Sequence, residues 1–439
     1  MIPATTVFAP QGGLVEEREF QTGRVRVAML CIHSSPLGDL GTEDTGGMSV
    51  YVRELSRALG QSGHRVDVYT CAGDPADDHQ TDLSGNARVI HLDIGQGRTV
   101  KKGDLFKYLP DVFTSLRAYL TDNRLHYDLI HSHYWLSGSV GLMARECCRL
   151  PHVMSFHTIG MAKRVSCAQE REPTPRLATE RDLARASDRI IASSERDKEL
   201  LERYYKVSGE KIAVVPCGVD LARFRPTGQE SARRQLGLKN AGSVVLYVGR
   251  FAPVKGIERL VAAVSHLRDH RGLRLEVVGG DGPGTPETTR LRRFIAAAGL
   301  GDIVTLCGRV DHSLLPTYYN AADVLVVPSY YESFGLVALE SLACGTPVVA
   351  TQVGAMNSLI RDGYSGEVVD RPTPRALACA IEKLIDGRVS TASRGEIRAS
   401  ISGYAWSHIA GAVRAEYEVA MGIFASRHRI DRGRESADD

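Results

Sequence analysis

The sequence predicts an α/β protein of two Rossmann-like, doubly wound domains, whose parallel sheets face each other across a cleft. Three observations predict this class. The chain has 439 residues, more than one hydrophobic core usually organises. Short apolar runs alternate with amphipathic stretches, which is typical of parallel strands covered by helices on both faces. The alternation stops at a Pro- and charge-rich segment, residues 217–242, and then restarts.

In the first half, the run RVRVAML (residues 24–30) is the first expected strand. Residues 49–63 are the first expected helix, because Tyr51, Leu55 and Leu59 recur at helical spacing and Gly63 can end it. Further strands are expected in RVDVYT, YDLIHSH, HVMSFHT, DRIIASS and KIAVVPCG.

The second half begins with an expected strand in SVVLYVGR (residues 243–250), a helix in IERLVAAVSHL and a strand in RLEVVGG. Apolar strands are expected in IVTLCGR, ADVLVVP and TPVVAT, and a last helix in YAWSHIAGAVRAEYEVAMG. The charged end RHRIDRGRESADD is expected to be disordered. The expected parts are a flexible N-terminal extension (1–23), an N-terminal domain (24–217), a C-terminal domain (218–403), a C-terminal helix (404–425) and a charged tail (426–439).

The composition excludes several classes of protein. The 54 basic and 52 acidic residues leave a net charge of +2, which gives no reason to expect a nucleic acid or an anionic membrane as partner. No apolar run reaches about 18 residues, and the N-terminus does not resemble a signal peptide. Nine cysteines without a CxxC pair favour a reduced, cytoplasmic setting.

Two glycine-containing segments are candidate anion sites. In GRFAPVKGIERL, a strand end is followed by Arg250, Lys255 and a helix N-terminus, where backbone N–H groups and both cations favour a phosphate. In TEDTGGMSVYVREL, Gly46 and Gly47 let the backbone approach a ligand closely. The alternatives are a surface loop with two cations, and a helix cap by Thr45 followed by a flexible turn.

Three other patterns do not support a site. The glycines of VVGGDGPG do not fall as GxGxxG, so we expect no nicotinamide cofactor. The His-x-His of HSHYWLSG lacks a third ligand at motif spacing, so no metal site is expected. No GxSxG segment indicates a serine hydrolase. The two carboxylates of ESFGLVALE, Glu332 and Glu340, stand either at a helix entrance or at a ligand.

Taken together, GGMSVYVRELSRAL, GRFAPVKG and ESFGLVALESLACGTPVVAT resemble the retaining glycosyltransferases of family four. The resemblance runs from about residue 24 to about residue 425. It implies the GT-B architecture, with the last helix crossing back to the first domain. Within the family, the motifs are most similar to the mycothiol-pathway enzymes that transfer N-acetylglucosamine to inositol phosphate, and they also resemble sucrose-phosphate synthases.

The resemblance implies a nucleotide-sugar donor, UDP-GlcNAc or UDP-glucose, and catalytic roles for Arg250, Lys255, Glu332 and His157. The implied donor site also contains Gly46, Gly47, Val310, Ser333, Phe334, Gly335, Leu336 and Glu340. Arg250 and Lys255 would hold the diphosphate, Glu340 the ribose, and Glu332 the transferred sugar. No tightly bound cofactor is implied, and Mg²⁺ can accompany the donor without being required.

The resemblance further implies a small phosphorylated acceptor, whose phosphate would be held by Lys102, Tyr134, Thr158 and Arg176. Ser49 stands where the inositol-phosphate enzymes carry Asn, so the identity of the polyol stays open. A homodimer is compatible with the sequence. Two alternatives also stay open: transfer to a lipid-linked or polysaccharide acceptor, and a protein that binds a sugar nucleotide without catalysis.

Overall fold

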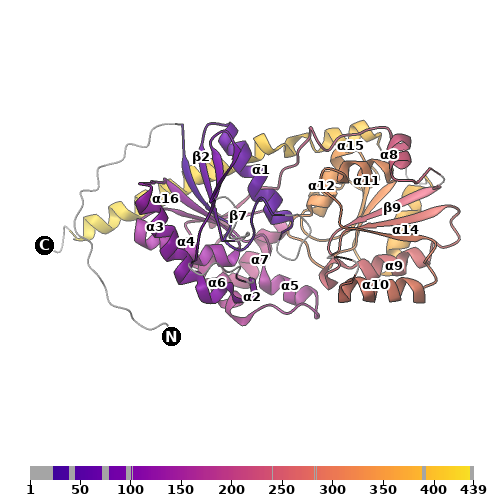
Figure 1. The fold of residues 1–439 in the computed structure, drawn as a ribbon, viewed down its shortest axis with the longest axis horizontal. Helices are drawn as coiled ribbons and strands as arrows, with labels where there is room; N and C mark the ends of the chain where they lie inside the picture. Colours follow the sequence, from indigo (N-terminus) through magenta and orange to yellow (C-terminus); the bar gives the residue numbers. More distant parts are fainter. Residues whose placement is uncertain are drawn as a thin grey trace.

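The computed structural model describes residues 23–38, 45–71, 79–94, 100, 102–239, 241–280, 282, 284–387 and 392–435. The expected N-terminal extension, apart from residue 23, lies outside these residues. Figure 1 shows two α/β units side by side, with the earlier part of the chain on the left and the later part on the right.

The first sheet has the strand order β3-β4-β2-β1-β5-β6-β7-β8 and is parallel except at the β3–β4 pair. Its strands are β1 (Arg26–Leu30), β2 (Arg65–Thr70), β3 (Gln80–Ser84), β4 (Ala87–His91), β5 (Leu129–His133), β6 (His152–Ser155), β7 (Arg189–Ala192) and β8 (Ile212–Val214). Its helices are α1 (Gly47–Gln61), α2 (Lys102–Leu105), η1 (Phe106–Tyr108), α3 (Leu109–Asp122), α4 (Tyr134–Cys148), α5 (Gly160–Ser166), α6 (Thr174–Ala186), α7 (Glu195–Tyr205) and η2 (Gly209–Lys211).

The second sheet has the order β11-β10-β9-β12-β13-β14 and is parallel throughout its described strands. Its strands are β9 (Ser243–Val248), β10 (Leu273–Val278), β11 (Val304–Gly308), β12 (Val324–Val327), β13 (Val348–Thr351) and β14 (Gly366–Val369). Its helices are α8 (Gln229–Gln235), η3 (Pro253–Lys255), α9 (Ile257–Ser265), α10 (Pro286–Ala297), α11 (Leu315–Ala321), α12 (Leu336–Ala343), α13 (Met356–Leu359), α14 (Pro374–Ile385), α15 (Arg394–Ser400) and η4 (Ser402–Tyr404).

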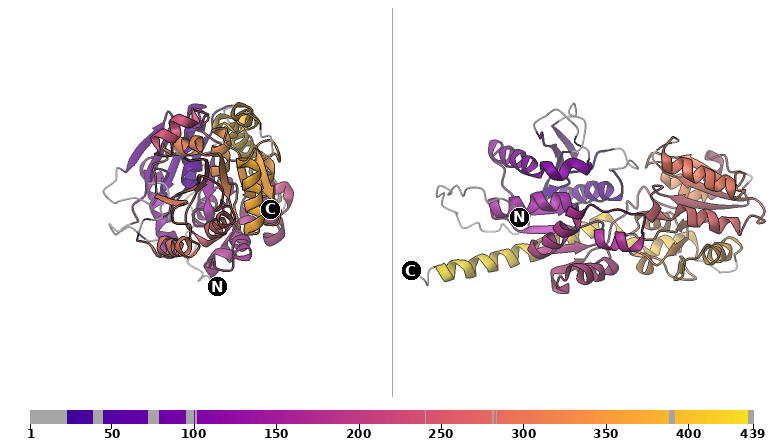
Figure 2. Two further views of the ribbon diagram at one scale, coloured as in Figure 1. Left: turned by 90° about the vertical axis from the view of Figure 1, so that its right-hand side faces the viewer. Right: turned by 90° about the horizontal axis from the view of Figure 1, so that it is seen from below.

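The last helix, α16 (Trp406–Glu435), returns from the second unit and runs along the first (Figures 1 and 2). It packs on α1 and β7. The Tyr417 hydroxyl lies 2.8 Å from His131 Nδ1 in β5, and Arg189 Nε donates to Glu416 Oε2 at 2.6 Å. Through Trp406 and Tyr417, one continuous buried core joins the two units.

The expected strands and helices are confirmed within a few residues, but the sequence prediction missed three strands and misjudged the end of the chain. β3 and β4 form the edge of the first sheet, and β3 is too polar (QTDLS) to be recognised as a strand. β14 is the short edge strand of the second sheet. The prediction of disorder from residue 427 was wrong as far as Glu435, because α16 continues to that residue.

Candidate active site

A cleft of about 430 Å³ lies between the two sheets, where loops following the strands of both units meet. This is the position at which doubly wound sheets bind ligands. Fifteen of the predicted site residues line it: Gly46, Gly47, Tyr134, His157, Thr158, Arg176, Arg250, Lys255, Val310, Glu332, Ser333, Phe334, Gly335, Leu336 and Glu340.

On the side of the second sheet, the central contact is an ion pair between Lys255 and Glu332. Lys255 ends η3, directly after the loop that follows β9, and its Nζ donates to both Glu332 oxygens at 2.7 and 2.8 Å. Ser329 Oγ donates to the same carboxylate at 2.8 Å. The Lys255 side chain is 26% exposed, so the ammonium remains within reach of a ligand in the cleft.

The N-terminus of α12 opens into the same cleft at Gly335. This residue has φ +105°, and a Cβ there would lie 2.0 Å from Met356 Cε, so the turn requires glycine. The first N–H groups of the helix have no partner within it and can bind an anion. From the first unit, Gly47 approaches closely, because a Cβ on it would lie 3.2 Å from Leu336 Cδ1.

Glu340 lies deeper in the cleft wall, inside α12. Its two oxygens accept from His312 Nε2 at 3.0 Å and from the Tyr319 hydroxyl at 2.7 Å. Burial, followed by the nearby Glu340 carboxylate, raises the pKa of Tyr319 well above its usual value, so the phenol stays a donor. A carboxylate oxygen can accept more than one hydrogen bond, so Glu340 can still bind hydroxyl groups.

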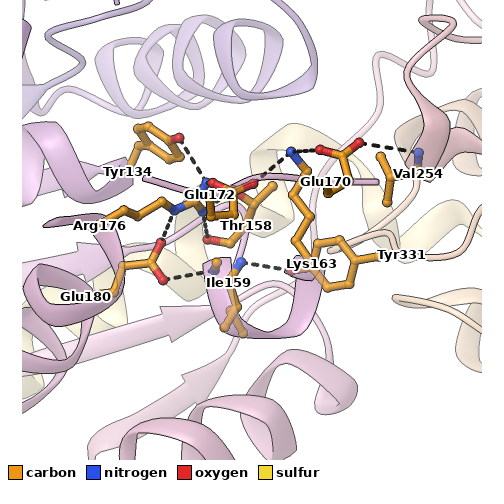
Figure 3. A network of polar contacts seen from close by, with 11 residues as sticks. Tyr134, Thr158, Ile159, Lys163, Glu170, Glu172, Arg176, Glu180, Val254 and Tyr331 are labelled. Atoms are coloured by element: carbon orange, nitrogen blue, oxygen red, sulfur yellow. Dashed lines mark hydrogen bonds and ion pairs between the residues drawn. The ribbon is translucent and has the colours of Figure 1, made fainter. Parts of the chain in front are cut away.

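On the side of the first sheet, Arg176 is the centre of a buried polar network (Figure 3). The side chain is 2% exposed, and its Nη2 donates to Thr158 Oγ1 at 2.8 Å and to the Thr158 carbonyl at 2.9 Å. Nη1 donates to the Tyr134 hydroxyl at 3.1 Å and to Glu172 Oε2 at 2.6 Å, while Nε donates to Glu180 Oε1 at 2.6 Å. Burial acts to lower the pKa of Arg176, but Glu180, Tyr134 and Glu172 outweigh it and raise the pKa.

Two residues of this half of the site have left-handed backbones although neither is glycine. Tyr134 after β5 has φ +74°, and His157 after β6 has φ +59°. Such conformations store strain and concentrate at functional sites. His157 Nε2 lies 2.8 Å from His133 Nδ1, and burial lowers the pKa of His157 to about 3, so its imidazole is neutral at pH 7. His133 therefore orients the His157 ring by a neutral hydrogen bond.

Comparison with known proteins identifies the family. Residues 45–223 match the model described as Glycosyltransferase Family 4, and residues 228–405 match the model described as Glycosyl transferases group 1. The protein named D-inositol 3-phosphate glycosyltransferase 2, from Catenulispora acidiphila, is 40% identical over 403 residues, which cover 89% of this chain and 94% of the relative. The chain belongs to the family 4 glycosyltransferases. It is an enzyme of the hexosyltransferase class, as the sequence predicted.

Solved structures show the same architecture as this glycosyltransferase. Sucrose-phosphate synthase from Thermosynechococcus elongatus is 34% identical and superposes with a TM-score of 0.83 over 92% of this chain and 100% of that chain. HepE from Anabaena, solved in complex with UDP and glucose, is 20% identical, has a TM-score of 0.71 and covers 90% of this chain and 99% of that one. The predicted GT-B fold is confirmed.

Two predicted acceptor residues cannot be assigned to the cleft of the glycosyltransferase, each for a different reason. Ser49 is fully buried, with its Oγ 2.6 Å from Ser34 Oγ, whereas its neighbours Met48 and Val50 line the cleft. Lys102 begins α2, and its side chain lies outside the described part of the chain.

Several polar residues of the cleft were not predicted from the sequence, among them His312, Lys163 and Asp197. His312 holds Glu340, and Lys163 binds Glu170 and Glu172 at 2.7 and 2.9 Å. Asp197, in the first turn of α7, accepts hydrogen bonds from Ser193 at 3.0 Å and from Ser333 of the second unit. Burial above all raises the pKa of Asp197 to about 7. Of these residues, only His312 could have been suspected from the sequence, because it lies in a loop that follows an expected strand.

Metal and membrane features can be judged only over the described residues. Among them, no group of three or more His, Cys, Asp and Glu side chains is placed to hold a metal ion. In the same part of the chain, no helix has both the length and the apolar content needed to cross a bilayer.

Proposed function

We propose that this glycosyltransferase transfers a hexose from a UDP-sugar to a hydroxyl of a small phosphorylated polyol or sugar, with retention of configuration. The observation that carries the proposal is the composition of the cleft, where the Lys255–Glu332 pair and the α12 N-terminus face Arg176, Tyr134 and Thr158. The proposal agrees with the relative named D-inositol 3-phosphate glycosyltransferase and with the sucrose-phosphate synthase neighbour.

The side of the second sheet suits a nucleoside diphosphate. Lys255, Arg250 and the α12 N-terminus are positive groups that would stabilise the charge developing on the departing phosphate, usually the largest single contribution to catalysis. Glu340 would accept from ribose hydroxyls and Glu332 from those of the transferred sugar. HepE, a protein of this fold, has been solved in complex with UDP-glucose, which is a donor of this kind.

The two carboxylates of the donor motif suit hydroxyl binding better than nucleophilic attack. Glu332 already accepts from Lys255 and Ser329, and Glu340 from His312 and Tyr319, which lowers the nucleophilicity of both. We infer front-face attack, in which the acceptor oxygen bonds to the anomeric carbon as the bond to the phosphate oxygen breaks. The departing phosphate then takes the hydroxyl proton, and no covalent sugar–enzyme intermediate forms.

On the opposite wall, Tyr134, Thr158 and Arg176 would hold the acceptor phosphate, together with Lys102. An Arg guanidinium matches phosphate oxygens in geometry and charge. Holding this group fixes the acceptor hydroxyl relative to the anomeric carbon, and such positioning lowers the barrier of a two-substrate reaction substantially.

The test is a matrix of UDP-GlcNAc and UDP-glucose against D-inositol 3-phosphate, hexose phosphates and their unphosphorylated forms, each with and without EDTA. Product mass identifies the sugar and the acceptor, and the proton coupling constant at the anomeric carbon identifies the stereochemistry. We expect turnover of a phosphorylated acceptor with an α-linked product. Conversion of free inositol but not of its phosphate would refute the role given to Arg176.

A further inference from the structure

The site proposed for the acceptor phosphate is already occupied by a carboxylate of this chain, that of Glu172. Glu172 lies in the segment between α5 and α6, residues 167–173, and its Oε2 is 2.6 Å from Arg176 Nη1. That nitrogen also donates to Tyr134, another member of the predicted phosphate group. Glu172 therefore contacts the guanidinium of Arg176 (Figure 3), which is the group proposed to bind a phosphate oxygen.

Without a ligand, the carboxylates of the network already outnumber its cations. Arg176 and Lys163 supply two positive charges, and Glu170, Glu172 and Glu180 supply three negative ones. Since Glu172 is 5% exposed and Arg176 2% exposed, water screens their attraction little. A phosphate entering beside an unmoved Glu172 would meet a net charge of −1 rather than an open cation.

Glu180 and Glu172 differ in how firmly they are held. Glu180 belongs to α6, is fully buried, and also accepts from the Gly160 N–H at 2.9 Å and from the Tyr205 hydroxyl. Glu172 lies outside any helix or strand, beside exposed Arg171 and Pro173. A residue in such a segment can move at a lower cost in free energy than one inside a buried helix.

We propose that Glu172 is a specificity-determining residue of the acceptor site, because its carboxylate occupies Arg176 until a phosphorylated acceptor displaces it. The inference rests on the proposed function. A small anion such as inorganic phosphate gains little beyond the contacts that Glu172 gives up. A phosphorylated polyol gains further contacts through its ring, so it displaces Glu172 where a simple anion does not. Glu172 thus keeps the site clear of common anions.

The matched control for this residue is Glu170. Its carboxylate also binds Lys163, and it accepts from the Val254 N–H of the second unit at 3.3 Å, but Glu172 and Glu180 are the carboxylates that contact Arg176. Glu172→Gln and Glu170→Gln each remove one negative charge from the same network. Only Glu172→Gln removes a carboxylate that competes with phosphate for Arg176.

The experiment measures the affinity for inorganic phosphate by calorimetry, with UDP present, and its inhibition constant against the acceptor. We expect Glu172→Gln to bind phosphate at least about tenfold more tightly than the unchanged protein, since one charge-assisted hydrogen bond no longer competes. The KM for the phosphorylated acceptor should fall, while the KM for the donor stays unchanged. Glu170→Gln should behave as the unchanged protein does. Glu172→Ala is the second variant, should the glutamine form not fold.

Unchanged or weaker phosphate binding in the Glu172 variants would overturn the inference and leave Glu172 as a support for the Arg176 side chain. An equal effect of Glu170→Gln would also overturn it, because total charge would then explain the result. If Glu172→Gln gains affinity for phosphate while no phosphorylated acceptor is ever turned over, Glu172 covers Arg176 as inferred, but the proposed function fails and the role of Glu172 in acceptor specificity fails with it.

Discussion

The cations on the two walls of the cleft differ in their exposure and in the number of carboxylates that contact them. On the wall of the second sheet, Lys255 is 26% exposed and shares one ion pair with Glu332. On the wall of the first sheet, Arg176 is 2% exposed and lies between Glu172 and Glu180. The first arrangement leaves an ammonium partly exposed in the cleft, whereas the second holds a guanidinium between two carboxylates.

The difference indicates that Arg176 and Lys255, although both are positively charged, have different roles. A buried ion pair fixes a side chain but is costly to break, whereas a partly exposed one contributes little to stability and can be exchanged for a ligand. We therefore expect substitutions of Arg176 to affect folding and acceptor binding together. Substitutions of Lys255 should affect catalysis and leave folding nearly unchanged.

The largest effect on stability is expected for Arg176→Ala, which leaves Glu180 buried without its cation and leaves Glu172 paired with Lys163 alone. Breaking a buried pair in this way costs about 3–5 kcal/mol of unfolding free energy. Denaturant unfolding measures it, with Arg26→Ala as control, because Arg26 pairs with Asp128 while 44% exposed and should cost about 1 kcal/mol or less. Equal losses in both variants would contradict the contrast between the two walls.

Lys255→Ala should reduce kcat/KM by about 100- to 1,000-fold, the usual loss when one group that stabilises a departing oxyanion is removed. The unfolding free energy should change by about 1 kcal/mol or less. Lys383→Ala is the matched control, since Lys383 makes the same contact with Glu367, at 2.8 Å, away from the cleft. Near-normal turnover in Lys255→Ala would remove the basis for placing the diphosphate at this residue.

The residues on the wall of the second sheet could be brought together from sequence because they lie close to one another in the chain. Arg250 and Lys255 are five residues apart, and Glu332 and Glu340 eight apart, so a strand end and a helix N-terminus suffice to bring each pair to one edge of the sheet. The alternating apolar runs likewise predicted most strands. Edge strands such as β3 escaped prediction, because a polar, half-exposed strand has no apolar run.

The residues on the wall of the first sheet could be brought together from sequence only in part. Tyr134, Thr158 and Arg176 come from three segments, and a resemblance placed them together before the structure did. Glu172 and Arg176 are four residues apart, a spacing that suits an ion pair only where the chain is helical. The contact could not be assigned from sequence, because Glu172 precedes the first residue of α6. The contact between Asp197 and Ser333 could not be predicted from sequence either, because 136 residues separate the two.

Glu340→Gln should raise the KM for the UDP-sugar by about tenfold, the loss of roughly one charge-assisted hydrogen bond. The amide keeps the size of the side chain, but its NH₂ cannot accept from Tyr319 or His312, nor from a ribose hydroxyl. Steady-state kinetics at saturating acceptor test this, with Glu367→Gln as control. A change in kcat alone, with the donor KM unaltered, would contradict the assignment of Glu340 to the ribose.

A pH-dependent effect is expected at Asp197, where the two walls touch through Ser333. Burial raises the pKa of Asp197 to about 7, from an ordinary value of 3.8, so the folded protein binds this proton more tightly than the unfolded chain. The contribution of Asp197 to stability is therefore complete below about pH 4 and is lost as the pH rises to about 7. Asparagine does not titrate, so the Tm of the unchanged protein minus that of Asp197→Asn should fall between about pH 4 and 7 and level off above it. Thermal unfolding at several pH values measures this, with the exposed Asp182→Asn as control. A constant difference would mean that Asp197 stays ionised at the contact between the walls.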